Sequence, residues 1–267
     1  MNYKLIATDF DGTLLTTDKK ITEKTKSVLL NYKKNNYKIV GVTARNFSSV
    51  KRVCNINLFD YLILNNGAFL YDVKNNYGHT IAFIPTEDVI QLTNHFKDIS
   101  QAIYYCTTDT YYIYSTKVEK PHDYFVKIDN LSEINDDISR MNIFGKNIEE
   151  VKTFQNNITN TFKNINSFIM QDSDRNLDNK WISINPKNTN KLNTLIKLCN
   201  ELNISLSQVI FFGDGPNDIE IIKNVGLGVA MSNALPEVKK IAKQITSSNN
   251  QDGVAFFLEN YLNINNN

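Results

Sequence analysis

The sequence is poor in cysteine and has no hydrophobic run long enough to span a bilayer. Cys54, Cys106 and Cys199 are odd in number and widely spaced. This spacing argues against a disulfide framework and fits reduced thiols in a cytoplasmic protein. The first residues, Met1 to Lys4, show no signal-peptide pattern. We therefore expect a cytoplasmic protein that does not enter a membrane.

Excess charge of either sign is also missing. Lys and Arg number 29 against 28 Asp and Glu, which gives a formal net charge of +1. No basic block stands out, so the sequence shows no footprint for nucleic acid. There is no internal repeat and no low-complexity linker. With 267 residues, 42% of them hydrophobic, the chain can form one large domain or two modest ones around a real core.

The opening stretch, Lys4 to Thr13, is the most informative part of the chain. The apolar run Leu5 to Ala7 stops at two acids, Asp9 and Asp11, followed by Gly12. A short apolar run of this kind is typical of a buried parallel strand. The acids would then lie at the carboxyl end of the strand, where open α/β sheets bind ligands. Two residues apart on extended backbone, their side chains point to the same side.

Two other interpretations of this stretch are possible. Asp-Gly is common in simple turns, and this interpretation stays open for the stretch taken alone. An EF-hand calcium loop would need Asx and then Gly where Thr13 and Leu14 stand. The EF-hand interpretation therefore fails.

Strands and helices alternate at both ends of the sequence. Apolar strands at 37–43 and 61–64 follow the first one, with helical segments near 21–34 and 46–55, and the alternation returns after Asn190. This pattern predicts βαβ units and a parallel sheet. Between them, hairpin signals join strands at 69–71 and 80–84 and at 102–106 and 111–114. Further strands are expected at 140–144, 168–171 and 181–184, with helices at 86–99 and 147–161. We expect an α/β core of residues 1–83 and 186–267, with an antiparallel α+β insert of residues 84–185.

A second acidic cluster follows another apolar strand. Phe211 and Phe212 lead into Gly213-Asp-Gly-Pro-Asn-Asp218, which places Asp214 and Asp218 at a strand end. If both strands belong to one parallel sheet, the two acid pairs meet at the same edge. Several carboxylates in one place favour a hard divalent cation, and Mg²⁺ prefers oxygen ligands and often bridges to phosphate. The alternative is two unrelated Asp-Gly turns, which leaves the preceding apolar strands unexplained.

In this order and spacing, the motifs resemble the haloacid dehalogenase (HAD) superfamily. Asp9-Phe-Asp-Gly-Thr13 resembles its motif I, Thr43 in Val42-Thr-Ala-Arg45 motif II, Lys191 motif III, and Gly213 to Asp218 motif IV. Asn65 to Ala68, Val229 to Ala234, Glu237 to Lys239 and Asp252 to Val254 are similar to the Cof-type subfamily, whose members have a C2B cap. The resemblance runs almost end to end. It implies a Rossmann-like parallel-sheet core with the insert as cap. Ala44 and Leu192 stand where the family usually has glycine.

The resemblance implies a role for each matched residue. Asp9 would be the nucleophile that forms an aspartyl-phosphate, and Asp11 the general acid and base. Mg²⁺ would be held by Asp9, the main-chain carbonyl of Asp11, and Asp214, with Asp218 close by. Thr43 and Lys191 would hold the phosphoryl oxygens. The substrate-binding set would be completed by Gly12, Ala44, Arg45 and Asn217. Taken alone, Thr43 would pass for a strand-end hydroxyl and Lys191 for a solvated helix lysine.

The implied function is a Mg²⁺-dependent phosphatase for small phosphorylated metabolites, sugar phosphates or similar monoesters, acting as a monomer or weak oligomer. The cap would set specificity, with candidates at Arg140, Asp174, Arg175, Lys180 and Trp181, although surface or packing roles are the commoner use of such residues. A phosphosugar mutase would need several cap arginines for a second phosphate, and this cap has two. A non-catalytic phosphometabolite sensor on the same scaffold would be expected to lose Asp9 or Asp11, and both are present.

Overall fold

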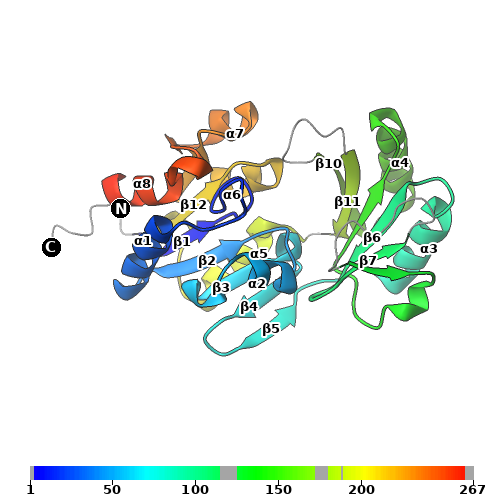
Figure 1. The fold of residues 1–267 in the computed structure, drawn as a ribbon, viewed down its shortest axis with the longest axis horizontal. Coiled ribbons are helices and arrows are strands. Elements are labelled where there is room, and N and C mark those ends of the chain that lie inside the picture. The colour runs from blue at the N-terminus through cyan, green and yellow to red at the C-terminus, as the bar shows by residue number, and fades with distance from the viewer. Residues whose placement is uncertain (1–2, 115–124, 172–179, 188, 262–267) are drawn as a thin grey trace. The chain divides into compact units, whose positions relative to one another are not determined.

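The chain folds into two compact units. The computed structural model describes residues 3–114, 125–171, 180–187 and 189–261. Unit 1 comprises residues 1–45, 49–79 and 190–267, and unit 2 comprises residues 46–48 and 80–189. Figure 1 shows the elements of both units. Each unit has its own sheet.

Unit 1 is built on an eight-stranded sheet in the order β14-β13-β12-β1-β2-β3-β4-β5. From β14 to β3 all neighbouring strands are parallel, whereas β4 runs antiparallel to β3. The strands are β1 (Leu5–Thr8), β2 (Lys38–Val42), β3 (Tyr61–Leu64), β4 (Phe69–Asp72), β5 (Tyr77–Thr80), β12 (Val209–Gly213), β13 (Leu227–Met231) and β14 (Gln244–Thr246). The predicted α/β core with a parallel sheet is confirmed.

The helices of this part of the chain follow the strands in alternation, as expected for βαβ units. They are α1 (Glu23–Lys34), α2 (Phe47–Val53), α5 (Lys191–Glu201), α6 (Ile219–Asn224), α7 (Pro236–Ile241) and α8 (Gly253–Tyr261). Local signals fix their ends. The Thr22 hydroxyl accepts a hydrogen bond from the Thr25 amide at the start of α1, and Lys33 and Lys34 occupy its last turn. The Asn190 side chain likewise caps α5 through the Asn193 amide, at 2.8 Å.

The core of unit 1 lies at the central strands of its sheet. Every residue of β1 and β12 is buried. Strands buried in this way are covered on both faces. Because these neighbouring strands run parallel, the polar residues that follow them lie at one edge of the sheet. In register, Ala7 lies beside Phe211 and Thr8 beside Phe212. Both acidic segments therefore leave the sheet at neighbouring positions.

Unit 2 is an α+β unit with a six-stranded sheet in the order β10-β11-β9-β6-β7-β8. Its strands are β6 (Ala102–Cys106), β7 (Tyr111–Tyr114), β8 (Phe125–Ile128), β9 (Arg140–Phe144), β10 (Ile165–Gln171) and β11 (Lys180–Pro186), and its helices are α3 (Thr86–Phe96) and α4 (Ile148–Thr161). The expected antiparallel pairing is wrong for one pair of strands, because β7 and β8 are parallel. The α+β character of the insert is confirmed.

Several element predictions were wrong in detail. The strand expected at 80–84 ends at Thr80, because Ile84 instead packs into the core of unit 2 and its amide donates to Ile138. Strand β8 was missed because its two central residues, Val126 and Lys127, are exposed and give no apolar run. The three-residue strand β14 was missed for its shortness. No helix of the described part of the chain is long and apolar enough to cross a bilayer.

Candidate active site

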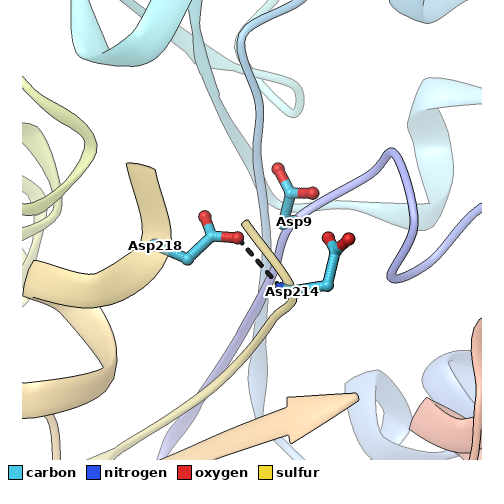
Figure 2. A group of neighbouring side chains, drawn as sticks. All are labelled: Asp9, Asp214 and Asp218. Atoms are coloured by element: carbon cyan, nitrogen blue, oxygen red, sulfur yellow. Dashed lines mark hydrogen bonds between the residues drawn. The ribbon is translucent and has the colours of Figure 1, made fainter. Parts of the chain in front are cut away.

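Three carboxylates of unit 1 meet at the carboxyl edge of its sheet. Asp9 follows β1, Asp214 follows β12, and Asp218 ends the single-turn helix 216–218. Each offers an oxygen within 4.8 Å of the other two. Figure 2 shows the three side chains gathered there from segments far apart in sequence. The two acidic motifs therefore form one cluster, with Asp9 and Asp218 buried and Asp214 half-buried.

Lys191 completes this cluster with a buried positive charge. It is the first residue of α5, and its ammonium donates to Asp9 Oδ1 at 2.6 Å and to Asp218 Oδ1 at 2.7 Å. Burial lowers the pKa of Lys191, but the charges of Asp218 and Asp9 outweigh burial and raise it above its usual value. The side chain is thus an ammonium at neutral pH. Two buried ion pairs with hydrogen bonds compensate much of its desolvation.

The cluster holds more negative charge than Lys191 alone can balance. Burial raises the pKa of Asp9 well above its usual value, the Asp218 and Asp214 carboxylates add to this effect, and Lys191 opposes it. Burial likewise raises the pKa of Asp214 to about 6, with Asp218 adding to the shift and Thr13 opposing it. A hard cation among the three carboxylates would relieve this repulsion and favour their ionised forms. Carboxylate oxygens at this spacing therefore fit a divalent ion such as Mg²⁺.

Main-chain groups hold the cluster in place. The amides of Asp214 and Gly215 both donate to Asp218 Oδ2 at 3.1 Å, and the Thr13 hydroxyl donates to Asp214 Oδ1 at 3.0 Å. Gly12 has φ +79°, and a Cβ at this position would lie 2.3 Å from Asp214 Oδ2. Only glycine allows so close an approach in the left-handed region. Glycine is therefore required at position 12 by the close contact with Asp214, while the predicted role of Gly12 in substrate binding stays a prediction.

Two cations bind the side chain of Asp11. Arg45 donates to Asp11 from Nε at 2.7 Å and from an η nitrogen at 2.8 Å, and Lys19 Nζ donates at 2.8 Å. Burial raises the pKa of Asp11, but the hydrogen bonds and charges of Arg45 and Lys19 outweigh it and lower the value to about 2. The expected metal contact of Asp11 concerns its main-chain carbonyl and stays a prediction.

The other predicted residues lie at neighbouring strand ends. Thr43 follows β2, is buried, and accepts from the Arg45 amide at 3.1 Å; Ala44 is half-buried beside it. Asn217 donates to the Asn66 side chain at 3.1 Å. Asn66 and its neighbour Asn65 both have positive φ in the turn after β3. The roles assigned to these residues stay predictions.

Two residues of this site, Lys19 and Asn233, were not predicted to belong to it, although Asn233 lies within the Val229 to Ala234 motif. Lys19 lies in an irregular loop, where an exposed lysine gives no signal. Asn233 donates to the Gly12 carbonyl at 2.8 Å. Asn233 follows the end of β13, so it could have been predicted in the same way as the acids that follow β1 and β12. The two residues bring further polar contacts to the loop that carries Asp11 and Gly12.

Comparison with known proteins identifies the family. The profile of the haloacid dehalogenase-like hydrolases matches residues 6–258. The chain belongs to this family. The haloacid dehalogenase-like hydrolase described here is also 30% identical to the protein YxeH of Bacillus subtilis (strain 168), which carries a provisional phosphatase name; the match covers 95% of this chain and 96% of YxeH. The chain described in Figure 1 is therefore a hydrolase, and its relative YxeH is named as a phosphatase.

Two further comparisons extend this likeness. The 5-amino-6-(5-phospho-D-ribitylamino)uracil phosphatase YitU of Bacillus subtilis (strain 168) is 27% identical over 97% of this chain and 98% of its own. A crystal structure of a haloacid dehalogenase-like hydrolase from Bacteroides thetaiotaomicron superposes with a TM-score of 0.80 at 22% identity, covering 97% of this chain and 99% of that chain. The HAD subclass IIB sugar phosphatase BT4131 has a TM-score of 0.78 at 20% identity, covering 96% and 98%. These structures confirm the HAD fold with its inserted cap.

Proposed function

We propose that this hydrolase removes phosphate from small phosphorylated metabolites through an aspartyl-phosphate on Asp9. The observation that supports the proposal is the single cluster of Asp9, Asp214, Asp218 and Lys191 at one sheet edge. Catalysis of phosphoryl transfer depends mainly on positioning the reacting groups and on stabilising charge, and this cluster supplies both. YitU is named for a substrate that carries phosphate on a ribityl chain, and BT4131 is titled a sugar phosphatase. Both names favour a phosphate ester of a hydroxylated carbon chain.

In the proposed reaction, an Asp9 carboxylate oxygen attacks phosphorus and the bond to the leaving oxygen breaks. Asp11 gives its proton to that oxygen, and the alcohol departs. A water molecule deprotonated by Asp11 then attacks the phosphorus of the aspartyl-phosphate, which frees Asp9 and inorganic phosphate. Lys191 and Thr43 would hold the phosphoryl oxygens. Mg²⁺ held by Asp9 and Asp214, with Asp218 beside them, would neutralise charge on the transferring group.

The state of Asp11 in this structure adds a condition to the proposal. A carboxyl with a pKa of about 2 is ionised at neutral pH and has no proton to give. Arg45 and Lys19 therefore have to release the Asp11 carboxylate, wholly or in part, when substrate binds, and the negative charge of the bound phosphate has to raise the pKa of Asp11. Apo geometry of a catalytic group often differs in this way from that of its complex.

The direct test is phosphate release from an aryl phosphate with and without Mg²⁺. We expect activity in the wild type that is lost with EDTA, restored by Mg²⁺, and abolished in Asp9→Asn. A matched control is Asp18→Asn, which changes an exposed aspartate and should keep full activity. Undiminished turnover by Asp9→Asn would contradict the covalent mechanism.

A further inference from the structure

After β3 the chain turns through three successive residues with left-handed backbone. Asn65 has φ +51°, Asn66 has φ +55° and Gly67 has φ +101°. Residues in this conformation normally occur singly, and only glycine, asparagine and aspartate adopt it readily. We call residues 65–67 the left-handed turn. Backbone of this kind is found mostly at functional sites, where contacts with the surrounding structure hold it in place.

The main chain of the left-handed turn is bonded to two elements of the candidate active site. The Asn66 amide donates to the Thr43 carbonyl, after β2, at 3.1 Å. The Gly67 carbonyl accepts from the Thr194 hydroxyl at 2.6 Å, in the helix that begins with Lys191. The main chain of Asn66 is therefore fixed between a strand end and a helix that each carry a predicted ligand of the phosphoryl group.

The side chain of Asn66 contacts a third element of the site. Its Oδ1 accepts a hydrogen bond from Nδ2 of Asn217, in the single-turn helix 216–218, at 3.1 Å. Both asparagines are half-buried. Oδ1 of Asn217 packs against Gly215, since a Cβ added to that glycine would lie 3.0 Å from the oxygen. The amide group of Asn217 is therefore confined by Asn66 at its nitrogen and by Gly215 at its oxygen.

The side-chain nitrogen of Asn217 has a second hydrogen to donate. An amide nitrogen carries two hydrogens, and the bond to Asn66 uses one of them. Among the residues that the structure describes, no acceptor is bonded to the other. The next residue, Asp218, belongs to the carboxylate cluster, so Asn217 lies beside the predicted metal ligands. A phosphoryl oxygen is an acceptor of the kind that this second hydrogen needs.

We infer that Asn66 is a positioning residue for the reaction, which orients the Asn217 amide so that its second N–H donates to a phosphoryl oxygen. The inference rests on the proposed function, since the ligand is the phosphate group of the ester. The left-handed backbone at residue 66 directs a short side chain at Asn217, and β-branched or bulky residues avoid this conformation. Both asparagines belong to unit 1, as do the carboxylate cluster and Lys191.

The test is a double-mutant cycle of Asn66→Gly and Asn217→Ala in the full chain, measured as kcat/KM for p-nitrophenyl phosphate. Glycine keeps the left-handed backbone and removes only the side chain. Asn217→Ala should lower kcat/KM by roughly tenfold, the effect of one lost hydrogen bond, and Asn66→Gly by at least about threefold. The double variant should match Asn217→Ala, because Asn66 acts only through that amide.

A purely structural role for Asn66 would give a different result. Asn66→Gly should unfold within about 4 °C of the wild type, because relief of the left-handed side chain offsets the greater entropy of unfolded glycine. Asn36→Gly is the matched control: Asn36 has φ +67°, is exposed, and precedes β2 at the opposite edge of the sheet. It should keep full kcat/KM. Unchanged kcat/KM in Asn66→Gly, a larger drop in its unfolding temperature, or a further loss in the double variant would overturn the inference.

Failure of the proposed function is distinguishable from these outcomes, because the wild type then releases no phosphate from the ester. In that case calorimetric binding of inorganic phosphate in the presence of Mg²⁺ is measured through the same cycle. Binding that weakens at least about threefold in Asn66→Gly, and no further in the double variant than in Asn217→Ala, supports the positioning role. Binding that is unchanged in Asn66→Gly, additive in the double variant, or absent in the wild type overturns it.

Discussion

Asp11 makes two salt bridges that keep its carboxyl ionised, with Arg45 and with Lys19. The proposed reaction nevertheless asks this group to protonate a departing alkoxide. The need for that proton depends on the leaving group, since a phenolate departs readily without one. The leaving group therefore separates the role of Asp11 from that of Asp9.

The first prediction concerns Asp11→Asn. We expect hydrolysis of alkyl phosphates to fall by about 100-fold or more, the usual worth of general acid–base catalysis, and hydrolysis of p-nitrophenyl phosphate to fall much less. The measurement is kcat/KM across a series of esters with leaving groups of rising pKa, because kcat/KM reports the transfer to Asp9 and not the later hydrolysis step, in which Asp11 also acts. An equal loss along the whole series would show that Asp11 does not transfer the proton.

The second prediction concerns pH and the metal. The pKa of Asp214 is raised from its ordinary value near 3.8 to about 6 in the folded protein, and that of Asp9 is raised in the same direction. The folded state then binds more protons than the unfolded state between about pH 4 and 6, so stability without metal should fall as pH rises through this window. The pKa of Asp11 is lowered instead, so Asp11 affects the pH dependence of stability only at lower pH, between about 2 and 4.

Mg²⁺ competes with these protons, so its stabilising effect should grow from pH 4.5 to 7. Thermal unfolding with EDTA and with saturating Mg²⁺ across this range measures both effects. Asp214→Asn should remove most of the Mg²⁺ stabilisation at every pH. A Mg²⁺ shift of the unfolding temperature that stays constant with pH would contradict the assignment of this cluster as the metal site.

At the scale of elements, helix α5 places Lys191 among the carboxylates. Its start is fixed twice: Asn190 caps the helix, and the Asn190 carbonyl packs against Gly67, where a Cβ would lie only 2.3 Å from that oxygen. The Thr194 hydroxyl also donates to the Gly67 carbonyl, at 2.6 Å. The turn after β3 therefore packs against the first turn of α5, and these contacts position the Lys191 ammonium.

The third prediction follows from this cap. Asn190→Ala should destabilise the protein by about 1 kcal/mol, the typical cost of a lost N-cap, and should lower kcat several-fold because Lys191 is held less firmly. Asn147→Ala is the matched control, since Asn147 caps α4 of unit 2 in the same way, with its side chain accepting from the Glu150 amide at 2.9 Å. It should destabilise by a similar amount and leave kcat unchanged. Equal kcat losses in the two variants would contradict a positioning role for the cap.

The strand ends could be predicted from the sequence because apolar runs and the polar residues after them are local signals. Asp9, Thr43 and Asp214 all follow buried strands of the parallel sheet, and parallel pairing alone brings such residues to one edge. The pairing of Asp11 with Arg45 and Lys19 could not be predicted, because it depends on how the loop after β1 folds back. The same holds for the loop contact of Asn233. These contacts are set by tertiary structure.

At the scale of the whole molecule, the alternation of elements predicted a parallel sheet in unit 1 and an α+β insert. It could not predict the strand order of unit 2. Strands β7 and β8 are separated by residues outside the described part of the chain and pair in parallel, and β8 exposes Val126 and Lys127. Such a pairing has no short turn that would fix it in the sequence. Of the predicted specificity residues, Asp174 and Arg175 also lie outside the described residues.

The remaining cap candidates have their own surroundings within unit 2. Arg140 is buried and hydrogen-bonds the Tyr111 hydroxyl and the Cys106 thiol. Trp181 stacks on Phe144, and Lys180 lies beside it in β11. Their roles in specificity stay predictions.

The fourth prediction uses the separate cores of the two units. The core of unit 2 includes Phe154 of α4, which is 4% exposed and packs edge-on against Phe96 of α3. Phe154→Ala should therefore destabilise unit 2 by about 3 to 5 kcal/mol. Because the proposed metal site lies wholly in unit 1, Mg²⁺ should still stabilise that unit. Scanning calorimetry of the variant should show two transitions, of which only the upper one rises with Mg²⁺. A single transition that moves as a whole with Mg²⁺ would show instead that the units unfold as one cooperative body.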